Sequence, residues 1–174
     1  INSYHGGSGS PAAGGSSITV ASIAGQRTNT RSLRVGDLIL IMQMQDSSSG
    51  ANAGMHEYAM ITAISGATLT LNQTLTNSYN QVMNTSNVRN WQVVWVPQYS
   101  SATVSGTVSA DRWTSDTGTG VGTGGVVAMD VAGSLALSGT VTVAGAGFRG
   151  AFGLNGTGNL AGGSINKFHR RRGR

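Results

Sequence analysis

Short alternating runs separated by glycine and serine turns are the feature that most constrains what this chain can fold into. The clearest run is Leu38 to Gln45 (LILIMQMQ), whose second half alternates strictly between two kinds of side chain. Similar runs occur at residues 57–65, 67–71, 91–96, 102–104 and 107–110. Because successive side chains of a strand point to opposite faces, this period favours β-strands over helices. We therefore expect an all-β fold.

The C-terminal half repeats the pattern at closer spacing. Three runs (VVAMDVA, LALS and GTVTVAG) lie between residues 126 and 145, with only short glycine or serine turns between them. Short strands joined by such turns form either a meander or the coils of a β-solenoid. The sequence predicts an antiparallel sandwich or barrel-like sheet, followed by a solenoid-like C-terminal part built from short strands.

Composition supports strands and argues against helices. Charged residues make up 10% of the chain, and 27 of its 174 residues are glycine. An amphipathic helix needs Lys, Arg and Glu on its wet face, and these residues are scarce here. At 39%, hydrophobic residues are too frequent for charge-driven disorder. The best helix candidate is the polar stretch 72–90.

The formal net charge of +5 belongs to the end of the chain. Up to residue 166 the acidic residues and the arginines are equal in number, so the body of the chain is neutral. The excess lies in Lys167, Arg170, Arg171, Arg172 and Arg174. No aromatic platform accompanies these arginines, so nucleic acid is not an expected partner.

Composition divides the chain into three parts. Residues 1–17 are rich in Gly and Ser and are expected to form a flexible arm. Residues 18–163 are expected to form a single all-β domain, and residues 164–174 a basic tail. The chain has no cysteine, no apolar run long enough to cross a membrane, and begins at Ile1. We expect a secreted bacterial protein, extracellular or at the cell surface, from which a leader has been removed.

Motifs that would indicate a cofactor are incomplete. Two glycine stretches, beginning at Gly120 and Gly145, match G-x-G-x-x-G, but neither precedes a helix-like sequence, as a dinucleotide site requires. His56-Glu57 begins like a zinc-protease motif, yet Met60 stands where the second histidine is needed. We expect no cofactor and no metal.

Acidic residues are few and leave little room for acid–base catalysis. Asp111, Asp116 and Asp130 do not have the spacing of a calcium loop and are expected to be solvated turn residues. Glycoside hydrolysis needs two carboxyl groups in one cleft. Glu57 with Asp111 or Asp116 is the candidate pair in this sequence. We expect no enzymatic activity, with a polysaccharide-acting enzyme as a remote alternative.

The tryptophans have two interpretations. Trp91 and Trp95 share one face of the run WQVVWV, and flat aromatic faces stack on sugar rings. Val94 and Val96 make the opposite face apolar too, which is typical of a central, buried strand. Burial in the core is favoured, and a glycan-binding adhesin that uses Trp91, Trp95 and Trp113 is the alternative.

A short alternating run, Ile18 to Ile23, follows the Gly/Ser-rich arm. A strand on a flexible arm can be added to the sheet edge of a neighbouring molecule, where backbone hydrogen bonds supply the affinity. We hypothesise that Ile18, Val20 and Ile23 form an assembly strand. The chain would then be an extracellular structural subunit that forms homo-oligomers, fibres or a surface matrix by β-strand exchange or addition.

Three motifs stand in order between residues 96 and 150: VPQY at 96–99, GGVVA at 124–128 and GFRG at 147–150. With the tryptophan-containing loop between the first two, they resemble a module of large, glycine-rich, secreted bacterial proteins. GDLILIMQMQ fits the same module, so the resemblance covers residues 36–150. It implies an adhesin-like or matrix role at the cell surface and no catalytic residue. The basic tail at 164–174 departs from the module, in which glycine-rich sequence would continue.

Overall fold

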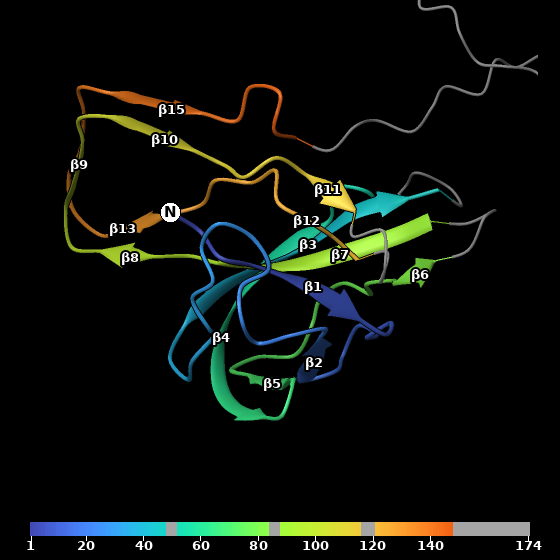
Figure 1. Cartoon of the computed structure of the whole chain (residues 1–174). Coiled ribbons are helices and arrows are strands. Elements are labelled where there is room, and N and C mark those ends of the chain that lie inside the picture. The colour runs from blue at the N-terminus through green and yellow to red at the C-terminus, as the bar shows by residue number, and fades with distance from the viewer. Residues whose placement is uncertain (48–51, 84–87, 116–120, 148–174) are drawn as a thin grey trace, which may run out of the picture.

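The computed structural model describes residues 1–47, 52–83, 88–115 and 121–147. These residues form fifteen strands and no helix, which confirms the all-β prediction. The strands make two parts, a barrel and a stack of short-strand coils beside it (Figure 1). The polar stretch 72–90 contains β6 and the start of β7, and its described residues form no helix. In the described chain, therefore, no helix is available to cross a membrane.

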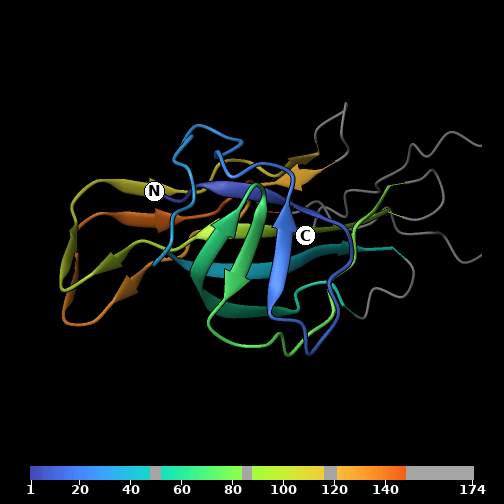
Figure 2. The same ribbon diagram turned by 90° about the horizontal axis from the view of Figure 1, so that it is seen from below.

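Six strands close into an antiparallel barrel. In order around the ring they are β1 (Tyr4–Ser8), β2 (Ser17–Val20), β5 (Thr68–Leu71), β4 (His56–Ser65), β3 (Leu38–Asp46) and β7 (Val88–Trp95). The pairing of β1 with β7 closes the ring, so each of these strands has a neighbour on both sides. Figure 2 shows β2, β5 and β4 side by side in one wall. The short β6 (Val82–Met83) pairs with the start of β7.

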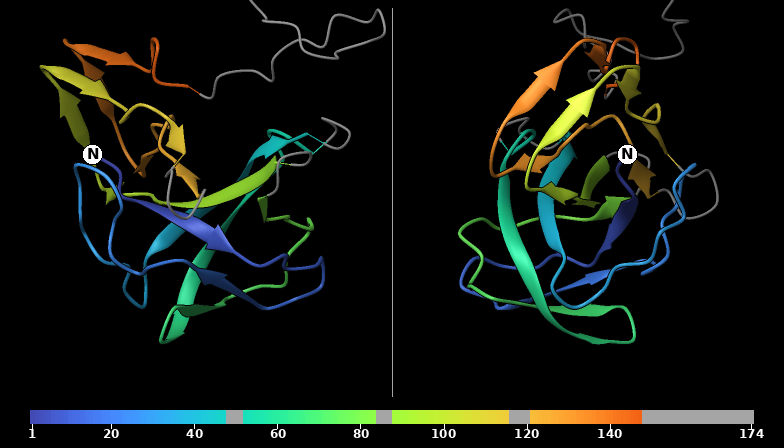
Figure 3. Two further views of the ribbon diagram at one scale, coloured as in Figure 1. Left: turned by 45° about the vertical axis from the view of Figure 1, so that its right-hand side comes forward. Right: turned by 90° about the vertical axis from the view of Figure 1, so that its left-hand side faces the viewer.

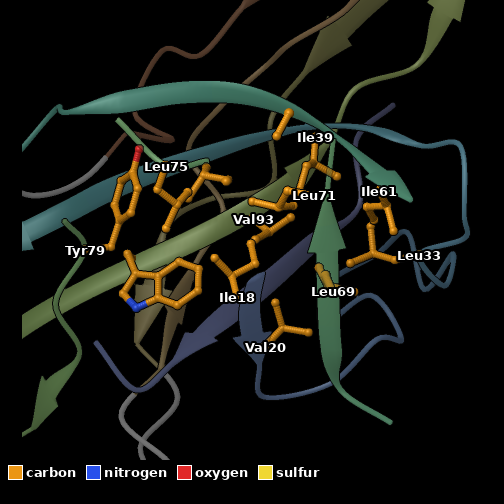
Figure 4. Close-up of a cluster of buried hydrophobic side chains, with 13 residues drawn as sticks. Ile18, Val20, Leu33, Ile39, Ile61, Leu69, Leu71, Leu75, Tyr79 and Val93 are labelled. Carbon is orange, nitrogen blue, oxygen red and sulfur yellow. The ribbon is translucent and has the colours of Figure 1, made fainter. Parts of the chain in front are cut away.

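The barrel interior holds the larger hydrophobic core (Figure 4). Ile39 and Ile41 of β3 point inward with Trp91 and Val93 of β7, as the alternation of both runs predicts. The full set of buried members is Ile18, Val20, Leu33, Ile39, Ile41, Ala59, Ile61, Leu69, Leu71, Leu75, Tyr79, Trp91 and Val93. Sequence-distant strands thus bury their apolar faces against one another.

The outer face of β7 is also buried, which confirms that this strand is central. Val94 and Val96 pack with Tyr4 and Leu40 in a second cluster on the outside of the barrel, with Val126 and Ala128 against it. Residues 126–128, which lead into the last short strands that the structure describes, therefore cover one outer face of the barrel. Figure 3 shows the barrel and these short strands from two sides.

The N-terminal segment differs from the flexible arm that we predicted. Residues Tyr4 to Gly7 are buried in β1, which hydrogen-bonds to both β2 and β7. Its two glycines are there for close packing, because a Cβ at Gly6 would overlap Val121 and a Cβ at Gly7 would overlap the Trp91 ring. Glycine marks a site of close approach here, and not a flexible linker.

The coils are made of short parallel strand pairs (Figure 1). Coil 1, residues 98–109, contains β8 (Gln98–Tyr99), β9 (Ala102–Val104) and β10 (Thr107–Ser109). Coil 2, residues 130–142, contains β13 (Asp130–Val131), β14 (Leu135–Leu137) and β15 (Thr140–Thr142). β13 pairs with β8, β14 with β9 and β15 with β10, all parallel. A hairpin of β11 (Thr114–Ser115) and β12 (Gly122–Thr123) lies between the coils in the chain.

This arrangement confirms the solenoid-like C-terminal part. The run at 126–132 was expected to be one strand, and only Asp130–Val131 is paired, because residues 126–128 pack on the barrel instead. The basic tail at 164–174, residues 148–150 of the GFRG corner and parts of both G-x-G-x-x-G matches lie outside the described residues.

Polar side chains join the barrel to the segment between the coils. The Gln92 side chain exchanges two hydrogen bonds of 2.9 Å with the backbone of Gly124. The Asn2 amide donates to the carbonyls of Trp95 and Ala128, at 2.8 and 2.6 Å, and accepts from the Ala128 N–H. Because Asn2 and Gln92 are buried, these bonds hold the two parts in one orientation.

Candidate functional site

The residues of the hypothesised assembly strand lie inside the barrel. Ile18 and Val20 are buried in β2, and Ile23 packs against the same core from the following loop. The backbone of β2 is paired with β1 on one side and β5 on the other, all within one chain. In this structure β2 offers no free edge, so an edge for pairing has to be sought elsewhere.

The three tryptophans are largely enclosed and are not brought together on one surface. Trp91 is fully buried and its Nε1 donates to the Gly9 carbonyl at 3.0 Å, while Trp113 is buried against Gly122. Trp95 is half-buried, and the guanidinium of Arg31 covers its ring at 3.9 Å from the centroid. These rings contribute to packing, as the core interpretation predicts.

The carboxylates of the described chain accept hydrogen bonds or form ion pairs within the same chain. Asp37 accepts both Arg31 guanidinium nitrogens at 2.8 and 2.7 Å, and Asp130 accepts from Gln98 at 3.1 Å. Asp46 accepts from Asn52 and lies 3.4 Å from Arg89. The described residues contain no group of three or more metal-ligating side chains. Asp116, one of the candidate acids, lies outside the described residues.

Glu57, the chain's single glutamate, holds the loop that follows β5. Its carboxylate accepts from the backbone N–H groups of Thr76 and Asn77, at 2.9 and 3.1 Å, and from the Tyr79 hydroxyl at 2.9 Å. Burial, and then the hydrogen bond to Glu57, raise the pKa of Tyr79. A carboxylate that accepts several donors is well suited to fix a loop.

His5 is a buried histidine with a structural role. It is completely enclosed within β1, 3.0 Å from the Ser3 hydroxyl and 3.2 Å from the Ser22 carbonyl. Burial lowers the pKa of His5 to about 4, against a hydrogen bond to Ser22 that raises it. The imidazole is therefore neutral at physiological pH.

A small polar pocket lies where the N-terminal segment, the 28–29 loop and the end of coil 1 meet. It has a volume of about 310 Å³ and is lined by Ile1, Asn2, Tyr4, Thr28, Asn29, Ser109 and Asp111. Asp111 accepts from the backbone N–H and the hydroxyl of Thr28, at 3.0 and 2.9 Å. Burial, with the charge of Asp111, raises the pKa of Tyr4 to about 12. The pocket can offer amide, hydroxyl and carboxylate groups to a small polar ligand.

The two coils stack in a nearly constant register. Leu137 pairs with Val104 and Thr142 with Ser109, so the partners in β14–β9 and β15–β10 are 33 positions apart, whereas those in β13–β8 are 32 positions apart. The Trp113 N–H donates to the Ala146 carbonyl at 2.8 Å, which continues the same spacing past the strands. The corners stack equally closely, since a Cβ at Gly139 would overlap the Gly106 carbonyl. Coil 2 thus covers coil 1 along the strands and at a corner.

Coil 2 leaves its own apolar side chains uncovered. Val104 of coil 1 is 7% exposed, but Leu137, which is stacked on it, is 60% exposed. Leu135, Val141 and Val143 are 43%, 43% and 45% exposed. Among the described strands, β14 and β15 each have one partner, in coil 1. Coil 2 therefore presents an unpaired strand edge beside exposed aliphatic side chains, which we call the coil-2 edge (β14, β15 and Val143).

Sequence reasoning did not select the coil-2 edge as a site. The signal was present, because residues 131–147 alternate aliphatic and small residues without a single charge. The 33-residue spacing was not recognisable, since two coils are too few to establish a repeat from one sequence.

No protein-family model matches this chain, and no curated protein sequence matches it. Solved structures with some likeness include three phage tailspikes. The tailspike gp49 of Pseudomonas phage LKA1 shares 23% identity and a TM-score of 0.38, over 62% of this chain and 17% of that chain. The Gp54 tailspike of Acinetobacter baumannii bacteriophage AP22, in complex with A. baumannii capsular saccharide, has 16% sequence identity and a TM-score of 0.39. The match covers 59% of this chain and 16% of that chain. The tailspike gp61 of Pseudomonas phage phi297 has 14% sequence identity and a TM-score of 0.36, and the match covers 82% of this chain and 20% of that chain. The chain spans a fifth or less of these proteins, and likeness at this level carries no functional conclusion.

Proposed function

We propose that this chain is a structural module of an extracellular or cell-surface assembly, joined to further β-structure at the coil-2 edge. The observation that carries the proposal is the stack of three parallel strand pairs, in which coil 2 is the last coil of the described residues and has exposed apolar side chains. Solenoid coils bury their apolar faces on the next coil, so an end coil needs another segment or a polar cap.

The barrel and the coils differ in whether their strand edges are paired. The barrel closes on itself, which removes the free edges of six strands. The coil-2 edge, by contrast, has neither Lys nor Pro, the residues that natural edge strands use to prevent pairing. An unprotected edge beside a fully closed barrel favours pairing with another β-segment as the role of this surface.

The role is non-catalytic in this proposal. Glu57 and Asp111, the described members of the acid pairs considered from the sequence, both accept hydrogen bonds that fix loops. The strand-exchange version of assembly through β2 is replaced here by strand addition at coil 2, because β2 is paired on both sides within the barrel.

A fluorescent peptide with the sequence of residues 130–147 tests the proposal, because it carries the pattern that covers coil 1. We expect it to bind the full chain and to raise fluorescence anisotropy. A control peptide with Asn in place of Leu135, Leu137 and Val141 should not bind. On the protein side, Leu137→Lys should weaken binding about tenfold, because a lysine on an edge strand opposes pairing.

Val35→Lys is the matched control on the protein, because Val35 is as exposed as Leu137 but lies outside the coils. It should leave peptide binding unchanged. Failure of the wild-type peptide to bind, or equal binding to both lysine variants and the wild type, would contradict the proposal.

Glycan binding is a second candidate, and the polar pocket is the observation that favours it. Sugar hydroxyls pair well with the amide and carboxylate groups of Asn29 and Asp111, and each carboxylate oxygen can accept a further hydrogen bond. A glycan array with the wild type and Asn29→Ala would test it. Binding that is lost in Asn29→Ala supports a glycan site, and an array without any bound glycan removes this candidate.

A further inference from the structure

We propose that the polar pocket is one end of a longer binding surface, which continues over the outward face of β10 and β15, and that its ligand is a neutral oligosaccharide. The longer site rests on the second candidate function, glycan binding at the pocket, which it extends to further hydroxyl groups on the coils. Three features carry it: a residue that the pocket shares with β10, a regular set of free hydroxyl groups, and the charge pattern of the surface.

Ser109 belongs to both the pocket and the strand pair. It lines the pocket at the end of coil 1, and it is the last residue of β10. Because side chains two positions apart on a strand point to the same side, Thr107 faces the same way as Ser109, and Val108 faces the opposite way. Thr107 and Ser109 are exposed, whereas Val108 is half-buried. The pocket wall therefore continues along β10 as an exposed face.

The parallel pairing of β10 with β15 doubles this row of hydroxyl groups. Thr140 lies beside Thr107, and Thr142 lies beside Ser109, and Figure 1 shows the two strands side by side. Paired strands are about 4.8 Å apart and alternate residues of a strand about 7 Å apart, so the four side chains form a regular array. We call this array the hydroxyl face (Thr107, Ser109, Thr140 and Thr142).

The hydroxyl groups of this face are free to bind a ligand. Those of Thr107, Ser109 and Thr140 make no hydrogen bond within the part of the chain that the structure describes. The Thr142 hydroxyl accepts from the Ala144 N–H at 3.1 Å and can still donate. Threonine has few χ1 rotamers, so ordering these side chains on a ligand costs little conformational entropy. The face thus offers donors and acceptors at fixed positions.

The charge pattern selects a neutral ligand. Residues 98–110 and 131–147, which include both strands, contain no charged residue. Among the described residues that line the pocket, Asp111 is the only one with a charged side chain. Its carboxylate would repel an acidic sugar, and the pocket lining has no Lys or Arg to pair with one. An oligosaccharide of neutral sugars carries hydroxyl groups along its length without charge, so it fits both the pocket and the hydroxyl face.

The size of the pocket indicates that a longer ligand has to continue outside it. Its volume of about 310 Å³ lies at the lower end of the range for ligand pockets, which is about 300–1,000 Å³. Asn2 and Tyr4 are buried and form its inner wall, so a saccharide chain can leave only on the exposed side. Ser109 connects that side to the hydroxyl face.

An array of neutral oligosaccharides of different lengths tests the longer site. The probes are glucose, galactose, mannose and N-acetylglucosamine oligomers from one to six units, with galacturonic acid oligomers as the acidic comparison. For at least one neutral series we expect the dissociation constant to fall at least about fivefold from the single sugar to the tetramer, because the tetramer reaches the hydroxyl face. Affinity that does not depend on length, or tighter binding of the acidic oligomers, would overturn the inference.

A double variant, Thr107→Val with Thr140→Val, isolates the hydroxyl face, because valine keeps the branched shape of threonine without its hydroxyl group. We expect it to weaken binding of the tetramer about tenfold and to leave binding of the single sugar unchanged. Thr103→Val is the control, since Thr103 is an exposed threonine of β9, outside the hydroxyl face, and it should bind as the wild type does. Circular dichroism confirms that each variant is folded. Equal affinity of the wild type and the double variant for the tetramer would contradict the longer site.

The Asn29→Ala variant separates the two failures. If sugars bind and Asn29→Ala abolishes their binding, but neither length nor the double variant has an effect, the pocket is a glycan site and only the longer site is wrong. If no neutral oligomer of any length binds, both the longer site and the second candidate function are wrong.

Discussion

The indole ring of Trp91 lies directly against Gly7, so a Cβ at position 7 would overlap the ring. This contact lies between the neighbouring strands β1 and β7, whose pairing closes the barrel, and the Trp91 Nε1 donates to the Gly9 carbonyl beside it. We predict that Gly7→Ala lowers the free energy of unfolding by about 2 kcal/mol or more, because neither backbone nor indole can give way freely. Urea denaturation followed by tryptophan fluorescence measures the change.

Gly106→Ala is the matched control, since a Cβ there meets no atom within 4 Å. Its free energy of unfolding should stay within about 0.5 kcal/mol of the wild type. Equal losses in Gly7→Ala and Gly106→Ala would mean that the contact with Trp91 does not set the requirement for glycine.

His5 makes stability depend on pH. Burial holds its pKa at about 4 in the folded chain, below the ordinary value of 6.5. Between these values the unfolded chain binds a proton that the folded chain does not, so stability falls as the pH is lowered from about 7. The expected loss between pH 7 and pH 5 is about 2 kcal/mol. His5→Gln should have lower overall stability and a flatter pH profile, whereas an unchanged slope would assign the pH dependence to other groups.

Glu57 is expected to act on stability through the loop that it holds. Replacing it with Gln puts an amide NH₂ group near the donors of Thr76 and Asn77, so at least one of these hydrogen bonds is lost. We predict a decrease of about 1–3 kcal/mol in the free energy of unfolding. Asp130→Asn is the control, because Asp130 is exposed and accepts from one side chain. A stable Glu57→Gln protein would contradict the structural role.

Arg31 joins an aromatic face to a carboxylate. Its guanidinium lies 3.9 Å from the Trp95 ring centroid and donates to both Asp37 oxygens. Arg31→Lys keeps the charge but loses the planar stacking and the paired hydrogen bonds, at a cost of about 1 kcal/mol. Trp95 should become more exposed, with tryptophan emission shifted to longer wavelength. The control Arg34→Lys, at an exposed neighbouring residue, should leave the emission spectrum unchanged.

The local sequence predicted those strands in which apolar and polar side chains alternate, because this alternation determines which face is buried. The run at Leu38 to Gln45 became β3 with Ile39 and Ile41 inside the barrel, and the run at 102–104 became β9. β1 was missed because it contains Gly6 and Gly7, one on each face of the strand, and the side chains that require these glycines, Val121 and Trp91, lie far away in sequence. The closure of the barrel through Tyr4 and Val94 is likewise a contact between distant segments without a local signal.

The candidate site was predictable only in part. Burial of Trp91 followed from two apolar faces on one strand, and the structure bears this interpretation out. The coil-2 edge was not predicted, because the exposure of Leu137 depends on whether a further strand stacks on it, and the sequence of β14 alone does not reveal this. Sequence alternation identifies a strand, but it does not show whether the strand has a partner on both sides.

Hydrogen exchange at backbone amides, with and without the 130–147 peptide, tests the coil-2 edge most directly. We predict slower exchange at Leu135–Leu137 and Thr140–Thr142 when the peptide is bound, because free edge donors become hydrogen-bonded. Exchange in β2 should be unchanged, since that strand is already paired on both sides. Unchanged exchange in β14 and β15, or new protection confined to β2, would contradict the assignment of the coil-2 edge as the surface for assembly.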